Sequence, residues 1–173
     1  MSRVAIASLS LLLSSSLFVV AGCDKETKAS VNKALGRYRA YDASVDGAQQ
    51  IAAAVAKARA ENKRVLVQFG GNWCVFCKAL DELIDKDPTL KAQHDKFVNV
   101  HVDAGANPNL NDVYGKPYDL GFPVLLVLDG DGKLLHTQPS TAFQLPTAVG
   151  HDPAGVLAFL SAWSTSDAPK AMP

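Results

Sequence analysis

The protein has 173 residues, of which 48% are hydrophobic and 20% are charged. This composition excludes an intrinsically disordered chain, which would have too few apolar residues to form a core, and the modest Gly and Pro content excludes a fibrous protein. The 17 basic residues balance 17 acidic ones, so nothing favours binding to nucleic acid. The length fits one domain with additional segments.

The chain contains three cysteines, Cys23, Cys74 and Cys77, so one thiol is left over if two of them pair. Cys74 and Cys77 form a Cys-x-x-Cys motif, whereas Cys23 stands alone near the N-terminus. The motif and the single cysteine therefore need separate explanations.

Residues 1–22 have the layout of a signal peptide: one positive charge at Arg3, an uncharged apolar stretch, and small residues before Cys23. The sequence Val-Ala-Gly-Cys over 20–23 resembles the bacterial lipobox, in which the cysteine is lipidated and becomes the new N-terminus. We therefore predict a lipoprotein signal peptide over 1–22 and a lipid anchor on Cys23, which would hold the protein to a membrane of the bacterial cell envelope, facing the periplasm. An uncleaved anchor helix is the alternative.

The mature chain is predicted to begin with a tether over 23–43, because this stretch is polar, mixed in charge and without sustained periodicity. A single domain over 44–164 follows, and its length is sufficient for one hydrophobic core. Residues 165–173 are predicted to be a flexible tail.

Hydrophobic periodicity predicts four helices and four strands within this domain. In chain order they are a helix over 46–62, a strand over 65–69, helices over 73–85 and 88–94, strands over 97–102, 123–128 and 133–137, and a helix over 152–163. Residues 103–120 are rich in Asn, Gly and Pro, and we expect a loop there with one helical turn around 109–114.

The order of these elements predicts an α/β domain with a mixed central β-sheet flanked by helices. A strand–helix–strand unit requires a parallel pair with a crossover connection. The Asp-Gly-Asp-Gly turn over 129–132 requires an antiparallel pair. Since both features fall within one domain, its sheet should contain strands of both directions.

The motif Trp73-Cys74-Val75-Phe76-Cys77-Lys78 stands where a buried strand gives way to a helix. The first thiol would lie at the helix N-terminus, where unpaired N–H groups and the helix dipole stabilise a thiolate. The second thiol would lie one turn along, from where it can attack a mixed disulfide on the first. This arrangement indicates thiol–disulfide exchange, with Cys74 and Cys77 as the redox-active pair.

A Cys-x-x-Cys motif also occurs in three other kinds of site. A zinc site would need a second pair of ligands, and the four histidines have no ligand spacing. A c-type haem requires histidine directly after the second cysteine, where this chain has Lys78. An inert structural disulfide remains open, although a bridge that closes so short a loop constrains the unfolded chain little. We therefore expect no metal and no cofactor.

The segment over 65–78, VLVQFGGNWCVFCK, resembles the active-site strand and helix of the thioredoxin superfamily. The strand over 97–103, the Gly-Phe-Pro sequence over 121–123 and the following hairpin also lie where that fold places them, so the resemblance covers about 46–163. The chain is most similar to envelope thioredoxin-like lipoproteins, including the C-terminal thioredoxin domain of transmembrane thiol:disulfide reductases, whose motif also has Val after the first Cys. The resemblance implies a thioredoxin fold.

The resemblance also implies roles for five residues. Cys74 matches the nucleophile, and Cys77 matches the resolving thiol. Trp73 matches the aromatic residue beside the site, Pro123 the cis-proline that faces the motif, and Phe122 the residue whose backbone pairs with a bound substrate chain.

Two departures from the family pattern concern the chemistry. Val75-Phe76 replaces the Gly-Pro of thioredoxin itself, so its redox potential cannot be transferred to this chain. Gln68 stands where thioredoxin has a buried acid that assists proton transfer, and an amide cannot serve as that acid or base. We expect Asp81 and Glu82 to be solvated helix charges; the alternative is that water or one of these carboxylates takes over the proton transfer.

The sequence therefore predicts an envelope thiol:disulfide oxidoreductase that acts on protein thiol and disulfide clients, in the reducing direction, and is recharged by a redox partner protein. Two alternatives remain. One is a thioredoxin-fold adaptor or chaperone whose Cys-x-x-Cys motif is not essential. The other is a dedicated thiol reductant in cytochrome c or copper-site maturation.

Overall fold

The computed structural model describes residues 38–164. The predicted signal peptide over 1–22, the lipidation site Cys23 and the predicted tail over 165–173 lie outside these residues. In chain order the described elements are α2 (Gly47–Glu61), β1 (Val65–Gly70), α3 (Val75–Lys86), α4 (Pro88–His94), β2 (Val98–Asp103), α5 (Leu110–Val113), η1 (Pro117–Leu120), β3 (Val124–Leu128), β4 (Leu134–Pro139), η2 (Ser140–Phe143) and α6 (Pro153–Trp163). None of the described helices combines the length and apolar character that a membrane span requires.

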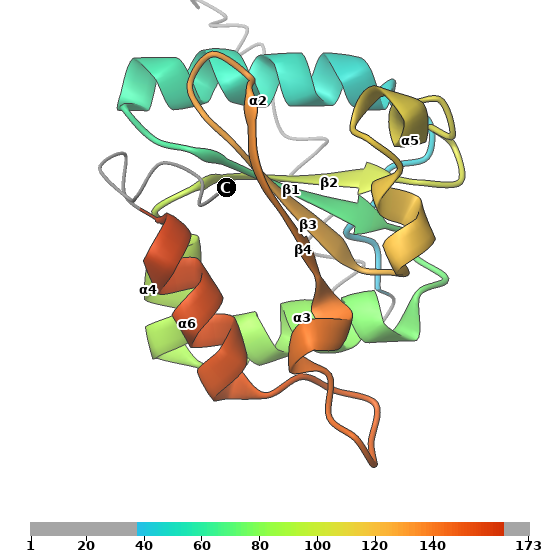
Figure 1. Ribbon diagram of the computed structural model, residues 1–173, viewed down its shortest axis with the longest axis vertical. Helices are drawn as coiled ribbons and strands as arrows, with labels where there is room; N and C mark the ends of the chain where they lie inside the picture. Colours follow the sequence, from blue (N-terminus) through green and yellow to red (C-terminus); the bar gives the residue numbers. More distant parts are fainter. Residues whose placement is uncertain (1–37, 165–173) are drawn as a thin grey trace, which may run out of the picture.

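The four strands form one sheet in the order β2-β1-β3-β4, with α2 on one side and α3, α4 and α6 on the other (Figure 1). β1 runs parallel to β2 and antiparallel to β3, so Val67 lies opposite Val100 on one side and Leu126 on the other. β3 and β4 form an antiparallel hairpin. The prediction of a mixed sheet flanked by helices is confirmed.

The sheet separates two hydrophobic cores, and β1 contributes to both. All six residues of β1 are buried. Val65, Val67 and Phe69 pack with residues of α2, while Leu66 packs with residues of α3, α4 and α6. Because side chains alternate across a strand, Gln68 points to the same side as Leu66. A polar side chain therefore lies within the core that α3 covers.

Aspartate side chains fix the start of three helices. Asp46 caps α2 by accepting a hydrogen bond from a backbone N–H of the first turn. Asp87 and Asp152 cap α4 and α6, and each is followed by a proline, which fits the first helical position because it lacks an N–H group. α3 begins directly after its N-cap residue, Cys74, and so starts two residues later than predicted.

The stretch over 103–120 was predicted as a loop with one helical turn around 109–114, and α5 lies at that turn. The 3-10 helix η1 was not predicted. Between α5 and η1 the chain reverses through Gly115 and Lys116, whose φ angles of 75° and 63° are both left-handed. The side chain of Asn111 accepts a hydrogen bond of 2.8 Å from the backbone N–H of Tyr118 and so holds η1 against α5. This side-chain bond joins residues seven positions apart, and the hydrophobic periodicity does not show it.

The residues before α2 are packed on the domain, and we call residues 38–45 the N-terminal segment. Tyr41 is only 3% exposed. Its backbone N–H donates to Asn72 Oδ1 at 3.2 Å, and its carbonyl accepts from Asn72 Nδ2 at 2.7 Å. The prediction of a tether up to residue 43 is therefore wrong for 38–43, because burial of aromatic surface compensates for the lost freedom of the chain.

We expect Leu126→Ala to lower the free energy of unfolding by about 2–5 kcal/mol, because Leu126 is fully buried in β3 and the shorter side chain would leave a cavity. Urea denaturation followed by circular dichroism measures this loss. Val113→Ala is the matched control, since Val113 is 67% exposed and its change should stay within about 0.5 kcal/mol. Equal losses in the two variants would contradict the packing described here.

Candidate redox site

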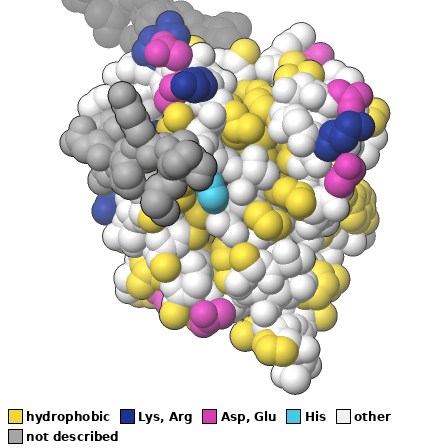
Figure 2. All heavy atoms as spheres, in the orientation of Figure 1, with side chains coloured by type: hydrophobic (Ala, Val, Ile, Leu, Met, Phe, Trp, Pro, Cys, Tyr) yellow, Lys and Arg dark blue, Asp and Glu magenta, His cyan; other side chains and the backbone are white. Residues whose placement is uncertain are grey.

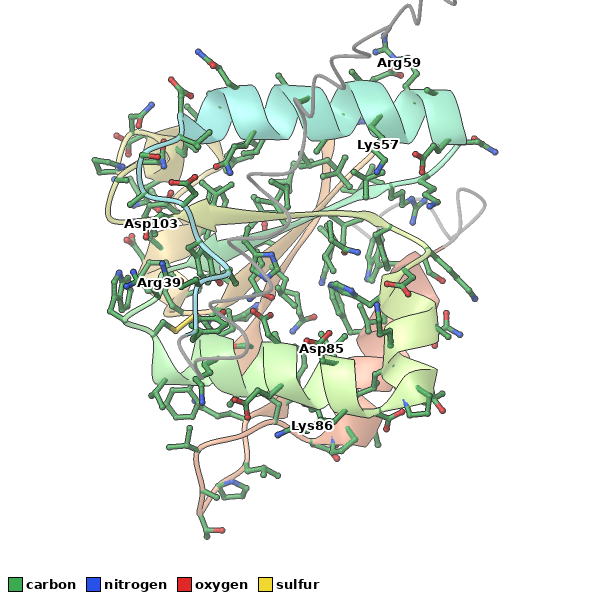
Figure 3. The ribbon with its side chains drawn as sticks, turned by 180° about the vertical axis from the view of Figure 1, so that it is seen from behind. Arg39, Lys57, Arg59, Asp85, Lys86 and Asp103 are labelled. Atoms are coloured by element: carbon green, nitrogen blue, oxygen red, sulfur yellow. A yellow bond between two sulfur atoms is a disulfide. The ribbon has the colours of Figure 1, made fainter. Side chains whose placement is uncertain are left out.

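Cys74 and Cys77 form a disulfide at the N-terminal end of α3, drawn as a yellow bond in Figure 3. Their Cα atoms are 5.2 Å apart, and Cys74 Sγ accepts a hydrogen bond of 3.1 Å from the backbone N–H of Cys77. The two residues differ in exposure, with 7% for Cys74 and 0% for Cys77. Cys74 therefore keeps a small exposed surface, whereas Cys77 is fully enclosed.

The position of Cys74 favours a thiolate in the reduced protein. It is the N-cap of α3, where backbone N–H groups lack partners within the helix and the helix dipole is positive. No acidic residue stands in the first turn of α3 to oppose a negative charge. A thiolate is the nucleophilic form of cysteine, so this location suits attack on a disulfide.

The aromatic and proline residues predicted for the site lie beside the disulfide. Trp73 is 63% exposed, and its ring contacts Phe122 edge to face with 5.5 Å between the ring centroids. Phe122 in turn packs against the cluster that contains both cysteines. The peptide bond between Phe122 and Pro123 is cis. The structure thus brings all five predicted residues of the motif and the Phe-Pro pair to one place.

A polar network lies beneath the disulfide, on the side of the sheet covered by α3. Gln68 is 4% exposed, and its Nε2 donates to Tyr41 Oη at 2.8 Å and to Asp81 Oδ1 at 3.0 Å. The other carboxylate oxygen of Asp81 accepts a hydrogen bond of 2.5 Å from the hydroxyl of Tyr38. His101 Nε2, from β2, lies 3.1 Å from Asp81 Oδ1. Four segments of the chain therefore meet at one carboxylate.

The surroundings of Asp81 hold its pKa below the ordinary aspartate value. Burial alone would raise this pKa, but the hydrogen bond and charge of His101, with the hydrogen bonds from Tyr38 and Gln68, stabilise the carboxylate more. Burial raises the pKa of Tyr41, and the charge of Asp81 raises it further. The network therefore combines an ionised carboxylate with protonated phenols.

The expectation that Asp81 is a solvated helix charge is wrong, since its side chain is only 19% exposed. The reason is its position on the face of α3 that packs towards His101 and Gln68. Glu82 is a solvated helix charge as predicted: its side chain is 44% exposed and pairs with Lys78 at 2.8 Å and Lys86 at 3.1 Å.

Sequence reasoning missed Tyr38, Tyr41 and His101 as parts of the site. The two tyrosines are three residues apart in a polar stretch, which is a weak signal for burial. His101 lies between Val100 and Val102 in β2, so its side chain points to the other face of the sheet from the two valines. This alternation does not indicate which side chain His101 contacts on that face.

No three Cys, His, Asp or Glu side chains within residues 38–164 are grouped to hold a metal ion. The described surface contains a groove of about 530 Å³ between α2, α5 and the β3–β4 turn. Hydrophobic side chains gather between α2 and α5 on this face (Figure 2). The groove is lined mainly by apolar residues, among them Ile51, Val55, Leu110 and Val113. It contains neither cysteine, and we assign no chemistry to it.

We expect the stability difference between the wild type and Asp81→Asn to depend on pH. The pKa of Asp81 is lowered by folding, so its ionised form stabilises the protein above the unfolded value of 3.8. This contribution is lost as the pH falls through the lower pKa of the folded protein. Urea denaturation between pH 7 and pH 2 should therefore show the difference shrinking. Asp112→Asn, with a side chain 79% exposed, should show no such trend, and a constant difference for Asp81→Asn would contradict the described network.

A family model described as thioredoxin-like matches residues 46–130. Among solved structures, the chain is similar to the disulphide isomerase from Xylella fastidiosa Temecula1, with 31% identity, a match covering 70% of this chain and 93% of that one, and a TM-score of 0.60. The DsbH oxidoreductase is 19% identical over 65% of this chain and 80% of that one, with a TM-score of 0.46. Thioredoxin NaTrxh from Nicotiana alata is 19% identical over 57% of this chain and 76% of that one, with a TM-score of 0.42. No curated protein matches the chain.

The matched range over 46–130 contains α2, the disulfide and the Phe122–Pro123 bond, and the similarity to the Xylella protein extends over nearly all of that structure. The sheet order, the helices on both faces and the disulfide at the start of α3 agree with this assignment. The chain therefore belongs to the thioredoxin superfamily.

Proposed function

We propose that the protein is a thiol:disulfide oxidoreductase that reduces disulfides in client proteins. The observation that carries this proposal is the Cys74–Cys77 disulfide at the N-terminus of α3, with Cys74 slightly exposed and Cys77 fully enclosed. The 31% identical Xylella protein is a disulphide isomerase, which supports thiol–disulfide chemistry in general. The reducing direction rests on the similarity of the motif, with Val75 after the first cysteine, to reductive envelope proteins.

The reaction cycle begins with the reduced protein. The thiolate of Cys74 attacks a client disulfide, and a mixed disulfide forms while the first client sulfur leaves and takes a proton from water. Cys77 then loses its proton and attacks Cys74 Sγ, which forms the disulfide seen here and releases the second client sulfur. The client gains two electrons and two protons, and a redox partner protein must return the same to the Cys74–Cys77 pair.

The surface around Cys74 suits a polypeptide client. Trp73 and Val75 flank it and are 63% and 56% exposed, so they offer apolar contact area to an unfolded or extended segment. The backbone of Phe122, next to the cis peptide bond, is the proposed pairing site for the client chain. Client recognition would then depend on backbone and apolar contacts and tolerate many sequences.

We expect Cys77→Ser to accumulate covalent complexes with client proteins, because the mixed disulfide on Cys74 can no longer be resolved. Non-reducing gels and mass spectrometry of the protein from its native host would detect these complexes. Cys74→Ser is the control and should trap nothing. An absence of trapped species in Cys77→Ser, together with an unreactive Cys74, would overturn the proposed activity.

We also propose that the protein is an envelope lipoprotein anchored through Cys23. The support is the lipobox-like sequence over 20–23 and the signal-peptide layout of the residues before it. Two or three acyl chains on one residue would give far firmer membrane binding than a single chain, since each buried methylene contributes about 0.8 kcal/mol. The redox domain would then work near the membrane surface on the periplasmic side.

We expect Cys23→Ser to abolish incorporation of labelled palmitate and to prevent normal processing of the precursor. Cell fractionation should show the wild type in the membrane fraction and a changed distribution for the variant. Cys74→Ser is the control, because it removes a cysteine and leaves the lipobox intact. Equal palmitate labelling of Cys23→Ser and the wild type would refute the anchor.

A further inference from the structure

A segment close to the redox motif is held to the domain by few contacts. Residues 144–151, which we call the projecting hairpin, are closed by a β-bridge between Gln144 and His151 and by a hydrogen bond of 3.0 Å from the N–H of Leu145 to the carbonyl of Gly150. Figure 1 shows the projecting hairpin in orange at the bottom of the view, on the side of the sheet covered by α3 and α6. Residues 145–149 are exposed, and His151 is the one buried residue of the hairpin.

His151 holds the projecting hairpin to the domain. It is 3% exposed, and its ring contacts those of Phe76 in α3 and Phe143 in η2 edge to face, with 6.1 Å and 5.8 Å between the centroids. Phe76 is half-buried, stands between the two cysteines in the chain and packs against the cluster that contains them. The hairpin is therefore attached to the redox motif through a single histidine.

The pocket of His151 favours a neutral ring. Neither ring nitrogen has a hydrogen-bond partner among residues 38–164. A neutral imidazole already gives up its hydrogen bonds to water in this pocket, and an imidazolium would in addition place a charge between aromatic rings. Burial accordingly lowers the pKa of His151 below its ordinary value of 6.5. The charged ring recovers its hydration only when it leaves the pocket.

The charged groups on the surrounding elements do not offset this cost. Lys78, near the start of α3, has the same sign as an imidazolium and pairs with Glu82 at 2.8 Å. Asp152 follows His151 in the chain, but its two carboxylate oxygens accept from N–H groups in the first turn of α6, at 3.2 Å and 3.0 Å. The hairpin, η2 and α6 itself contain no Asp, Glu, Lys or Arg. A protonated His151 would therefore lack a counter-ion within these elements.

We propose that the projecting hairpin is a pH-sensitive cover over Phe76, closed while His151 is neutral and opened when His151 takes up a proton from water. Opening breaks the bridge between Gln144 and His151 and moves the imidazolium into solvent. It also uncovers Phe76 beside the disulfide, which enlarges the apolar surface that a client can contact. This effect on clients rests on the proposed function, whereas the opening itself does not.

The direction of the pH dependence follows from the two states of His151. In the open state the ring is in water and its pKa lies near 6.5, whereas the closed state holds the pKa lower. The open state therefore binds more protons. Closure is fully favoured above pH 6.5 and weakens as the pH falls towards the lower pKa of the closed state. The ratio of open to closed molecules should rise by up to about 10-fold for each pH unit in that interval.

Hydrogen exchange followed by NMR tests the opening in the oxidised full-length protein in detergent micelles. The N–H groups of Leu145 and Asp152 report on the hairpin, because they donate to the carbonyls of Gly150 and Phe143 at 3.0 Å and 2.7 Å. Relative to the intrinsic rate at each pH, their exchange should accelerate as the pH falls from 7 to 5. The N–H of Val98, which is hydrogen-bonded at the start of β2, should show no such change.

Four variants assign the response to the contact between His151 and Phe76. His151→Phe places a ring without a titrating group in the same pocket, so exchange in the hairpin should lose its pH dependence. His136→Phe removes a half-exposed histidine of β4 and should keep the wild-type response. Phe76→Ala should accelerate exchange in the hairpin already at pH 7, because His151 loses a packing partner. Val75→Ala, at the exposed neighbouring position, should not.

Several outcomes would contradict the cover. Exchange in the wild-type hairpin that does not depend on pH would overturn the inference, as would an unchanged pH response in His151→Phe. Equal acceleration at Val98 would also overturn it, because the whole domain would then be opening. A pKa of His151 at or above 6.5, read from its ring signals in the wild type, would do so without any variant. None of these measurements requires turnover, so an absence of thiol–disulfide exchange would overturn the proposed function alone.

Discussion

Strand β1 is buried on both faces along all six of its residues, and the position of the redox site follows from this constraint. Because side chains alternate across the strand, a shift by one residue would turn each of them into the opposite core. The packing of α2 on one side and of α3, α4 and α6 on the other therefore locks the strand in register. Its end at Gly70 then determines where the chain enters the turn before Cys74, so the disulfide is placed by hydrophobic packing.

Because β1 is buried, the side-chain amide of Gln68 needs hydrogen-bond partners within the protein. A buried amide without partners would cost several kcal/mol, so the strand can hold it only where hydrogen bonds are available. Tyr41 and Asp81 supply those partners, and a carboxylate buried in this way needs partners of its own, which Tyr38 and His101 provide. One polar residue in a hydrophobic strand thus ties together the N-terminal segment, α3 and β2.

The local part of the site could be predicted from the sequence because its signals lie close together. The strand over 65–69, the glycines after it and the cysteine at the helix start are all within a few residues. Tyr41 and His101 could not be predicted, since their contacts join residues 27 and 20 positions apart and depend on the packing of three elements. The exposure of Asp81 was misjudged for the same reason: a helix pattern shows which residues share a face, and only the folded sheet shows what that face meets.

The two ends of the described domain attach at opposite ends of β1. Tyr41 is held by Asn72, just beyond the strand, whereas Arg64, just before it, lies over the ring of Trp163 at 5.6 Å and donates to its carbonyl at 3.3 Å. A mechanical load applied between these ends would act along the strand axis, so the hydrogen bonds of β1 to β2 and β3 would share it in shear. The sheet would resist such a load, and the first bonds to feel it would be those between Tyr41 and Asn72, two residues from Cys74.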